Sequence, residues 1–222
     1  MSARAEEPRS LIDIPGLKQA VVFLLLVNFA LYAREDWLAA AALAGADATF
    51  LDWIGAFATT LDEAAWFALL FLFEFELRFL SRGGGARAFG LLMWCARALC
   101  CLVIAHTFFS NVRDLEALLG DGSAVAGELA LAWVALVEGL AWLAIILLLF
   151  LDERALASGR DAGHAIRGVP KLAGYCVLLF AAAYWAAAGH YLYAWDELLW
   201  VSAFGGVDLG FRRSRRAGPA AA

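Results

Sequence analysis

Hydrophobic residues gather in six long stretches along the chain, and shorter polar segments separate them. The stretches cover residues 17–32, 61–80, 88–109, 125–151, 170–193 and 195–211. Because a helix rises 1.5 Å per residue, about 20 apolar residues span the hydrocarbon core of a bilayer. The pattern therefore predicts an all-α, polytopic membrane bundle of six transmembrane helices, paired as three helical hairpins.

The segment between the first two stretches, residues 34–60, has its own pattern. Its apolar residues recur at helical spacing and lie opposite Asp47 and Asp52, which is typical of an amphipathic helix in the membrane interface. The apolar residues of this face are Phe50, Trp53, Ile54 and Phe57. Alternatively, this helix continues directly into the second transmembrane helix.

Composition agrees with a membrane protein. Hydrophobic residues make up 64% of the 222 residues and charged residues 18%, and the mean hydropathy is +0.73, which soluble domains do not reach. Six spans use nearly the whole chain, so no sizeable soluble domain is expected. The four cysteines lie in apolar runs without a CxxC spacing and are expected to be reduced packing residues.

The distribution of positive charge predicts the orientation. Only Arg34 and Arg113 lie in the segments after the odd-numbered stretches, whereas 14 lysines and arginines lie at the other side: in or next to the N-terminal segment, or in or next to the segments that follow the even-numbered stretches. Since cytoplasmic segments carry the excess of positive charge, both termini are expected in the cytoplasm. The predicted location is the plasma membrane, in particular a bacterial inner membrane, with cytoplasmic tails at residues 1–16 and 213–222.

A spaced motif occurs three times: an acid, three residues, Trp, eleven residues and Arg. This motif predicts an internal repeat with units at 17–82, 88–158 and 170–213, and hence pseudo-threefold symmetry. The copies are Asp62/Trp66/Arg78, Glu138/Trp142/Arg154 and Asp196/Trp200/Arg212. A purely topological explanation is open, because acids suit helix starts, Trp the aromatic belt, and Arg the cytoplasmic helix ends.

Glu138 fits that topological explanation poorly, because it lies well inside an apolar stretch. An ionised, unpaired carboxylate within the bilayer costs about 3 kcal/mol, so such residues usually face a bundle interior or a wet cavity. Arg97 lies near the middle of the third stretch and needs a carboxylate. By depth, either Glu74 or Glu138 is its expected partner.

Two further acids, Glu74 and Asp208, each precede an arginine by four residues, Arg78 and Arg212. Ion pairs within one helix are the expected result. Gly205 and Gly206 lie just before Asp208, where they predict either a kink that lines a cavity or a close packing contact.

His106 and His190 lie near the outer ends of the third and fifth stretches. Equal depth on two helices is what a bis-histidine haem or a metal at the outer face requires. The alternative is that both are interfacial residues beside aromatic side chains, with no cofactor.

The favoured function is a small transporter or channel-like protein for protons or cations. Glu138 would alternate between protonated and ionised forms, with Arg97 balancing its charge. The alternatives are a structural or assembly subunit of a membrane complex and a haem electron carrier. The common nucleophile, phosphate, zinc-protease and dinucleotide motifs do not occur in the sequence, so no enzymatic activity is expected. The expected partners are the lipid bilayer and protein subunits or further copies, but no nucleic acid.

Overall fold

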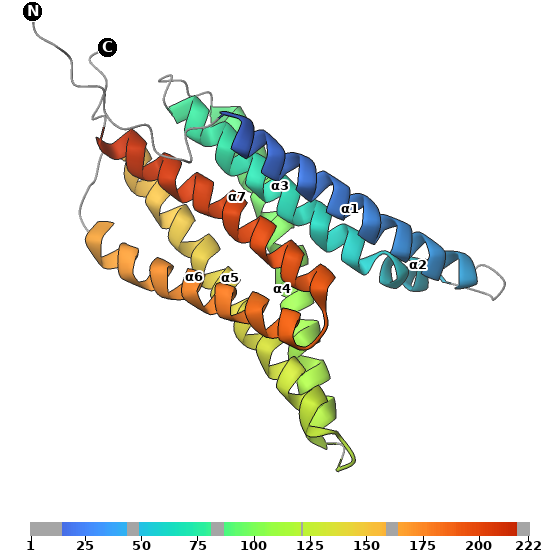
Figure 1. Ribbon diagram of the computed structural model, residues 1–222. Helices are drawn as coiled ribbons and strands as arrows, with labels where there is room; N and C mark the ends of the chain where they lie inside the picture. Colours follow the sequence, from blue (N-terminus) through green and yellow to red (C-terminus); the bar gives the residue numbers. More distant parts are fainter. Residues whose placement is uncertain (1–14, 44–48, 81–86, 121, 159–163, 217–222) are drawn as a thin grey trace, which may run out of the picture.

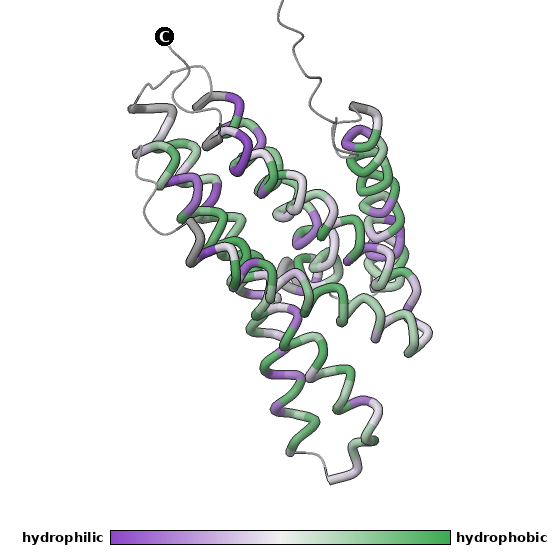
Figure 2. Tube along the Cα trace, turned by 60° about the vertical axis from the view of Figure 1, so that its left-hand side comes forward, coloured by the Kyte–Doolittle hydropathy of each residue, from purple (hydrophilic) through white to green (hydrophobic). Residues whose placement is uncertain are grey.

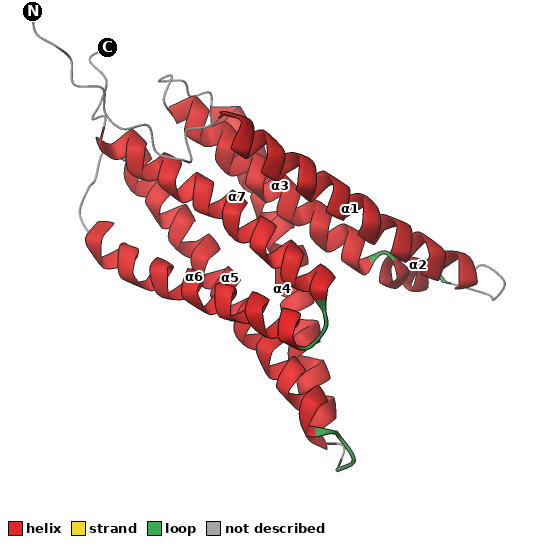
Figure 3. Ribbon diagram, in the orientation of Figure 1, coloured by secondary structure: helices red, strands yellow, loops and turns green. Residues whose placement is uncertain are grey.

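The protein is all-helical, as predicted. The computed structural model describes residues 15–43, 49–80, 87–120, 122–158 and 164–216, and these residues form seven helices and no strand (Figures 1 and 3). The helices are α1 (Pro15–Leu43), α2 (Phe50–Ala56), α3 (Ala58–Leu80), α4 (Arg87–Gly120), α5 (Ala126–Ala157), α6 (His164–Ala187) and α7 (Tyr191–Arg216).

Each of the six long helices runs in the opposite direction to the long helix before it. The start of α1 and the end of α7 lie at the same end of the bundle (Figure 1), which we call the inner end, and the opposite end is the outer end. Helix α3 packs against α1, α4 and α7, whereas α5 packs against α4, α6 and α7. The starts of α3, α5 and α7 therefore lie toward the outer end.

Four helices in the described part of the chain are long and apolar enough to cross a membrane. They cover Gly16–Ala42, Gly90–Gly120, Ala126–Ala157 and Arg167–Ala187. Figure 2 shows hydrophobic residues along most of these helices, which is compatible with a helical membrane protein. Helices α3 and α7 have 23 and 26 residues, but they carry more acids and arginines in their interiors.

Several helix boundaries differ from the predicted ones. Helix α1 continues to Leu43 instead of ending at Tyr32. In this extension, Asp36 accepts hydrogen bonds of 2.7 Å from both the amide and the hydroxyl of Thr60, at the start of α3. Helix α4 likewise continues to Gly120, where Leu115 is buried. Tertiary contacts thus extend both helices into polar sequence.

Helix α6 is displaced toward the inner end relative to the prediction. It begins at His164, so Pro170 lies inside the helix instead of in its first turn, and it ends at Ala187. Gly189, with a φ of 86°, makes the turn into α7, and a glycine suits this left-handed backbone because it lacks a Cβ. Helix α7 therefore starts at Tyr191, earlier than expected.

The predicted short helix before α3 exists as α2, separated from α3 by a turn at Phe57. Its start is a capping box, in which the Thr49 hydroxyl accepts from the Asp52 amide and Asp52 accepts from the Thr49 amide. The expected break at residues 83–85 and nearly all of both expected tails lie outside the described residues.

Candidate functional site

The three tryptophans of the predicted repeat meet in the centre of the bundle. The ring centroid of Trp66 lies 5.1 Å from that of Trp142 and 6.0 Å from that of Trp200. Phe204 packs against all three, with centroid distances of 5.5–6.0 Å. We call these four residues the aromatic layer, and each of them is buried. The repeat relation itself remains a prediction.

On the outer side of the aromatic layer, five acids from three helices lie close together. We call them the acid cluster: Asp62 and Glu63 of α3, Glu138 of α5, and Asp196 and Glu197 of α7. It includes all three acids of the repeat motif, each of them half-buried. Their sequence neighbours Glu63 and Glu197 are only 5% exposed.

Neutral donors from several helices bind these carboxylates. The Trp185 indole donates to Glu138 at 2.6 Å, and the Trp142 indole donates to Glu197 at 3.0 Å. Asp62 accepts from the Trp66 indole at 3.0 Å and the Thr107 hydroxyl at 2.8 Å, and Asp196 accepts from the Asn28 amide at 2.5 Å. These bonds hold the acids in place without a formal positive charge.

The acids also pair with one another. Glu138 lies close enough to Glu197 to interact with it electrostatically, and Glu63 likewise to Asp196. Two carboxylates form a hydrogen bond only when one of them carries a proton. Among the described residues, Oε2 of Glu63 and Oε1 of Glu197 are buried and accept no hydrogen bond from a neighbouring donor. A proton shared within each pair would give these buried oxygens a donor.

Arg97 does not bind either of its expected partners. Its Nη1 lies 2.7 Å from Oε1 of Glu153, and its Nη2 lies 2.5 Å from Oε2 of Glu76. The guanidinium carbon lies 5.4 Å from the ring centroids of both Phe73 and Phe150. The predicted partners of Arg97 were wrong because they were chosen by depth alone, which selected Glu74 and Glu138. The direction of the side chains around the helix axis decides instead, and Glu76 and Glu153 face α4 near the inner end.

A second charged group lies at the inner end, around Lys171. The lysine is fully buried and contacts both Asp152 of α5 and Asp208 of α7. Arg167 lies 2.7 Å from Asp152, and Arg212 lies 2.8 Å from Asp208. The expected pair between Asp208 and Arg212 therefore exists, but it belongs to a network that joins α5, α6 and α7.

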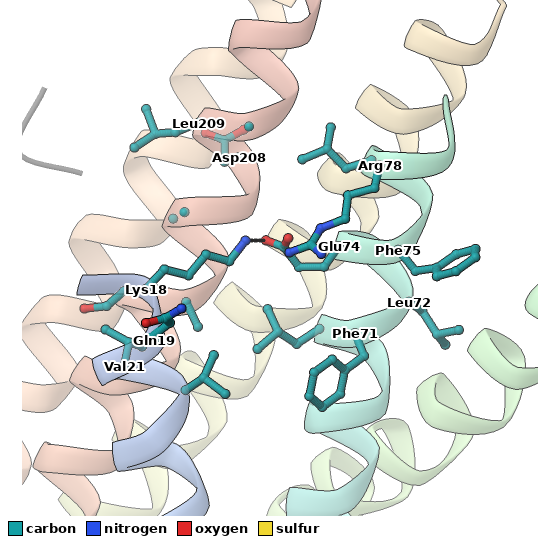
Figure 4. A pocket seen from close by; sticks show the side chains of 18 of the residues that line it. Lys18, Gln19, Val21, Phe71, Leu72, Glu74, Phe75, Arg78, Asp208 and Leu209 are labelled. Carbon is teal, nitrogen blue, oxygen red and sulfur yellow. Dashed lines mark ion pairs between the residues drawn. The ribbon is translucent and has the colours of Figure 1, made fainter. Parts of the chain in front are cut away.

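Glu74 binds Lys18 of α1, an ion pair that the sequence did not indicate. Figure 4 shows the two side chains pointing toward each other, with Arg78 beside them. Arg78 and Arg154, the other repeat arginines, are exposed near the inner end. Helix α7 is continuous through Gly205 and Gly206, which line a crevice without a close contact. The helix is not unwound at these two glycines, and they face open space instead of a close packing contact.

His106 and His190 are both exposed, on α4 and at the start of α7. The His190 ring contacts Trp185 and Tyr193, at centroid distances of 5.6 and 5.9 Å. Within the described residues, no three histidines, cysteines or acids are placed to hold a metal ion. A haem between the two histidines remains an untested prediction.

Sequence reasoning missed several buried or half-buried polar residues of both sites: Asn28, Glu63, Glu76, Asp152, Glu153, Lys171 and Glu197. A signal for four of them was present. The dipeptide Asp-Glu occurs at 62–63, 152–153 and 196–197, each time at an edge of an apolar stretch. Adjacent acids that recur at such edges indicate more than helix capping.

Comparison of the chain with protein-family models, curated proteins and solved structures finds no match in any of the three.

Proposed function

We propose that this protein crosses a plasma membrane six times, with its inner end in the cytoplasm, and that it transfers protons through the acid cluster. The orientation is supported by the bias of lysines and arginines toward the inner end. The charges of α3 and α7 that reduce their hydropathy are largely covered by other helices. This burial supports the proposal that α3 and α7 cross the membrane, in addition to the four more apolar helices.

The observation that carries the proton-transfer proposal is the pairing of Glu138 with Glu197. A half-buried carboxyl beside a buried carboxyl could take up a proton from one side and share it with the other. Within the described residues, no lysine or arginine forms an ion pair with any member of the acid cluster. The charge of the acid cluster therefore depends on how many of its carboxyls are protonated. This favours protons over larger cations as the transported species.

In this proposal, Glu138 is the entry site and Glu197 is the next acceptor. Trp185 and Trp142 each hold one oxygen of these two acids, leaving the other oxygens to share the proton. The aromatic layer separates this cluster from the charged groups at the inner end. Passage of a proton to the inner end therefore requires the aromatic layer to open. Helix α7 can move to open it, because Gly205 and Gly206 have free space beside them.

Proton flux into proteoliposomes, driven by a pH gradient, tests the proposal. Glu138→Gln keeps the side-chain shape and the bond from Trp185 but removes the titratable group. Its flux is expected to fall about a hundredfold, the lower end of the range for loss of a proton-transfer group. The matched control is Glu128→Gln, at the exposed start of the same helix, which should retain wild-type flux. Equal flux in both variants, with insertion verified, would refute the role of Glu138.

The alternative is a structural or assembly subunit without transport activity. The ion pairs around Arg97 and Lys171 favour it, because buried pairs of this kind fix which helices pack together. A subunit predicts no flux above empty liposomes and a stable partner that copurifies with the protein. Proton transfer predicts flux from the purified chain alone, so one reconstitution distinguishes the two.

A further inference from the structure

A crevice of about 1620 Å³ opens between α1, α3 and α7 toward the inner end, and it lies apart from the acid cluster. Figure 4 shows side chains of α1 and α3 on either side of it. Much of its wall is apolar and stays exposed, with Phe23 of α1 at 65% and Phe71 of α3 at 55%. The apolar wall includes Val22, Phe23, Leu26, Phe71, Phe75 and Leu209.

The inner rim of the crevice is positively charged. Four cationic side chains and two carboxylates, Glu74 and Asp208, line it; the cations are Lys18, Arg78, Arg212 and Arg213. Lys18 is more than half exposed. Nε of Arg212 is buried and has no hydrogen-bond acceptor within the part of the chain that the structure describes. The rim thus has charge and at least one buried donor for an anion.

Two glycines of α7 keep the crevice open. A Cβ added at Gly205 or Gly206 would meet no atom within 4 Å, whereas a Cβ at Gly210 would lie 2.5 Å from Cδ2 of Leu77. Gly210 therefore allows α7 to approach α3, while Gly205 and Gly206 leave space beside the helix. Larger side chains at these two positions would occupy the crevice without displacing α7.

We infer that the crevice binds an anionic phospholipid of the cytoplasmic leaflet. The phosphate lies at the rim, where arginines bind phosphate oxygens bidentately, and the acyl chains follow the apolar wall. A zwitterionic lipid brings its own cation to a rim lined by four cationic side chains, so it binds more weakly. The inference uses the orientation proposed above but is independent of proton transfer.

Native mass spectrometry of the detergent-purified protein, titrated with dioleoyl phosphatidylglycerol or dioleoyl phosphatidylcholine, tests this. The double variant Arg78→Gln/Arg213→Gln should bind phosphatidylglycerol about tenfold more weakly, since each basic residue near anionic lipid contributes about fivefold at most. Gly206→Leu should weaken phosphatidylglycerol binding to a similar extent, because the leucine side chain fills the crevice. The matched controls are Arg154→Gln, an exposed inner-end arginine outside the crevice, and Gly90→Leu, at an exposed helical glycine on α4.

The expected result is a loss in both crevice variants, wild-type binding in both controls, and weak phosphatidylcholine binding throughout. Equal binding of the two lipids by the wild-type protein would overturn the inference. So would an equal loss in Arg154→Gln, because this would indicate diffuse attraction to the whole inner surface. Circular dichroism of each variant separates lost binding from lost fold. Since no flux is measured, failure of proton transfer does not affect the outcome.

Discussion

The indole nitrogen of Trp142 donates a hydrogen bond to Oε2 of Glu197 at 3.0 Å and so joins α5 to α7 inside the bundle. Both residues are buried, and the other carboxylate oxygen of Glu197 accepts no bond from a neighbouring donor. The bond therefore links the aromatic layer to the acid cluster. It also orients the side chain that faces Glu138.

Replacing Trp142 by Phe should destabilise the fold. The variant keeps an aromatic ring but leaves Glu197 without its one neutral donor, and a buried polar group that loses its partner costs about 1–3 kcal/mol. The measurement is the free energy of unfolding in mixed detergent micelles. Trp133→Phe, at an exposed position of the same helix, is the control. An equal change in both variants would contradict the importance of this bond.

Replacing Arg97 by Gln should have a larger effect. It leaves Glu76 and Glu153 facing each other without the guanidinium that binds both, and loss of one partner of a buried ion pair costs about 3–5 kcal/mol. Arg97→Gln/Glu153→Gln should recover part of this loss, because only one carboxylate then remains. The comparison uses thermal unfolding, with exposed Arg113→Gln as control. A double variant no more stable than Arg97→Gln would argue against the pair.

Gly174 permits the close approach of α6 to α5. A Cβ at this position would lie 3.0 Å from Cγ1 and 3.1 Å from Cδ1 of Ile145, so Gly174→Leu should overpack the contact and lower stability by about 1–3 kcal/mol. Gly168→Leu on the same helix, where an added Cβ meets nothing within 4 Å, is the control and should not be less stable than the wild type. A thermal-unfolding midpoint that is the same for both would show that α6 can shift freely.

The capping box at the start of α2 should make that helix sensitive to acid. Hydrogen bonds from the Thr49 side chain and backbone lower the pKa of Asp52. A lowered pKa means that the ionised form stabilises the helix above the ordinary carboxyl range, and that this contribution is lost as the pH falls through the lowered value. Hydrogen exchange of the α2 amides, corrected for intrinsic rates, should show protection fading on acidification.

Thr49→Ala is the control for the capping box. It removes the hydroxyl bonds, so α2 should be less protected at neutral pH and should change less on acidification. If the variant and the wild-type protein respond to acid equally, another group must be responsible.

Much of the helical architecture could be predicted from the sequence, because apolar stretches of membrane-spanning length report directly on helices. Helix ends were harder to predict. The polar residues after Tyr32 and after Phe109 appeared to end helices, yet both helices continue. Whether a helix continues into polar sequence depends on contacts such as that between Asp36 and Thr60, and these join residues distant in the sequence.

The candidate site was predicted only in part. The repeat spacing selected Glu138, Asp62 and Asp196, which do lie near one another, and the three tryptophans, which do meet. The partners of Arg97 were missed because depth along a helix is visible in a sequence, whereas the direction of each side chain around the helix axis depends on packing. Glu63 and Glu197 were missed because each stands next to a more conspicuous acid.

The enclosed position of Lys171 has a consequence for biosynthesis. In the proposed orientation, α6 on its own would hold an unpaired ammonium near the cytoplasmic edge of the bilayer, and an unpaired charge within a span costs up to about 3 kcal/mol on insertion scales. Helix α5 is synthesised first and carries Asp152, which contacts Lys171 in the finished protein. We therefore expect the insertion machinery to release α5 and α6 together as a preformed hairpin, so that Lys171 enters the lipid already neutralised.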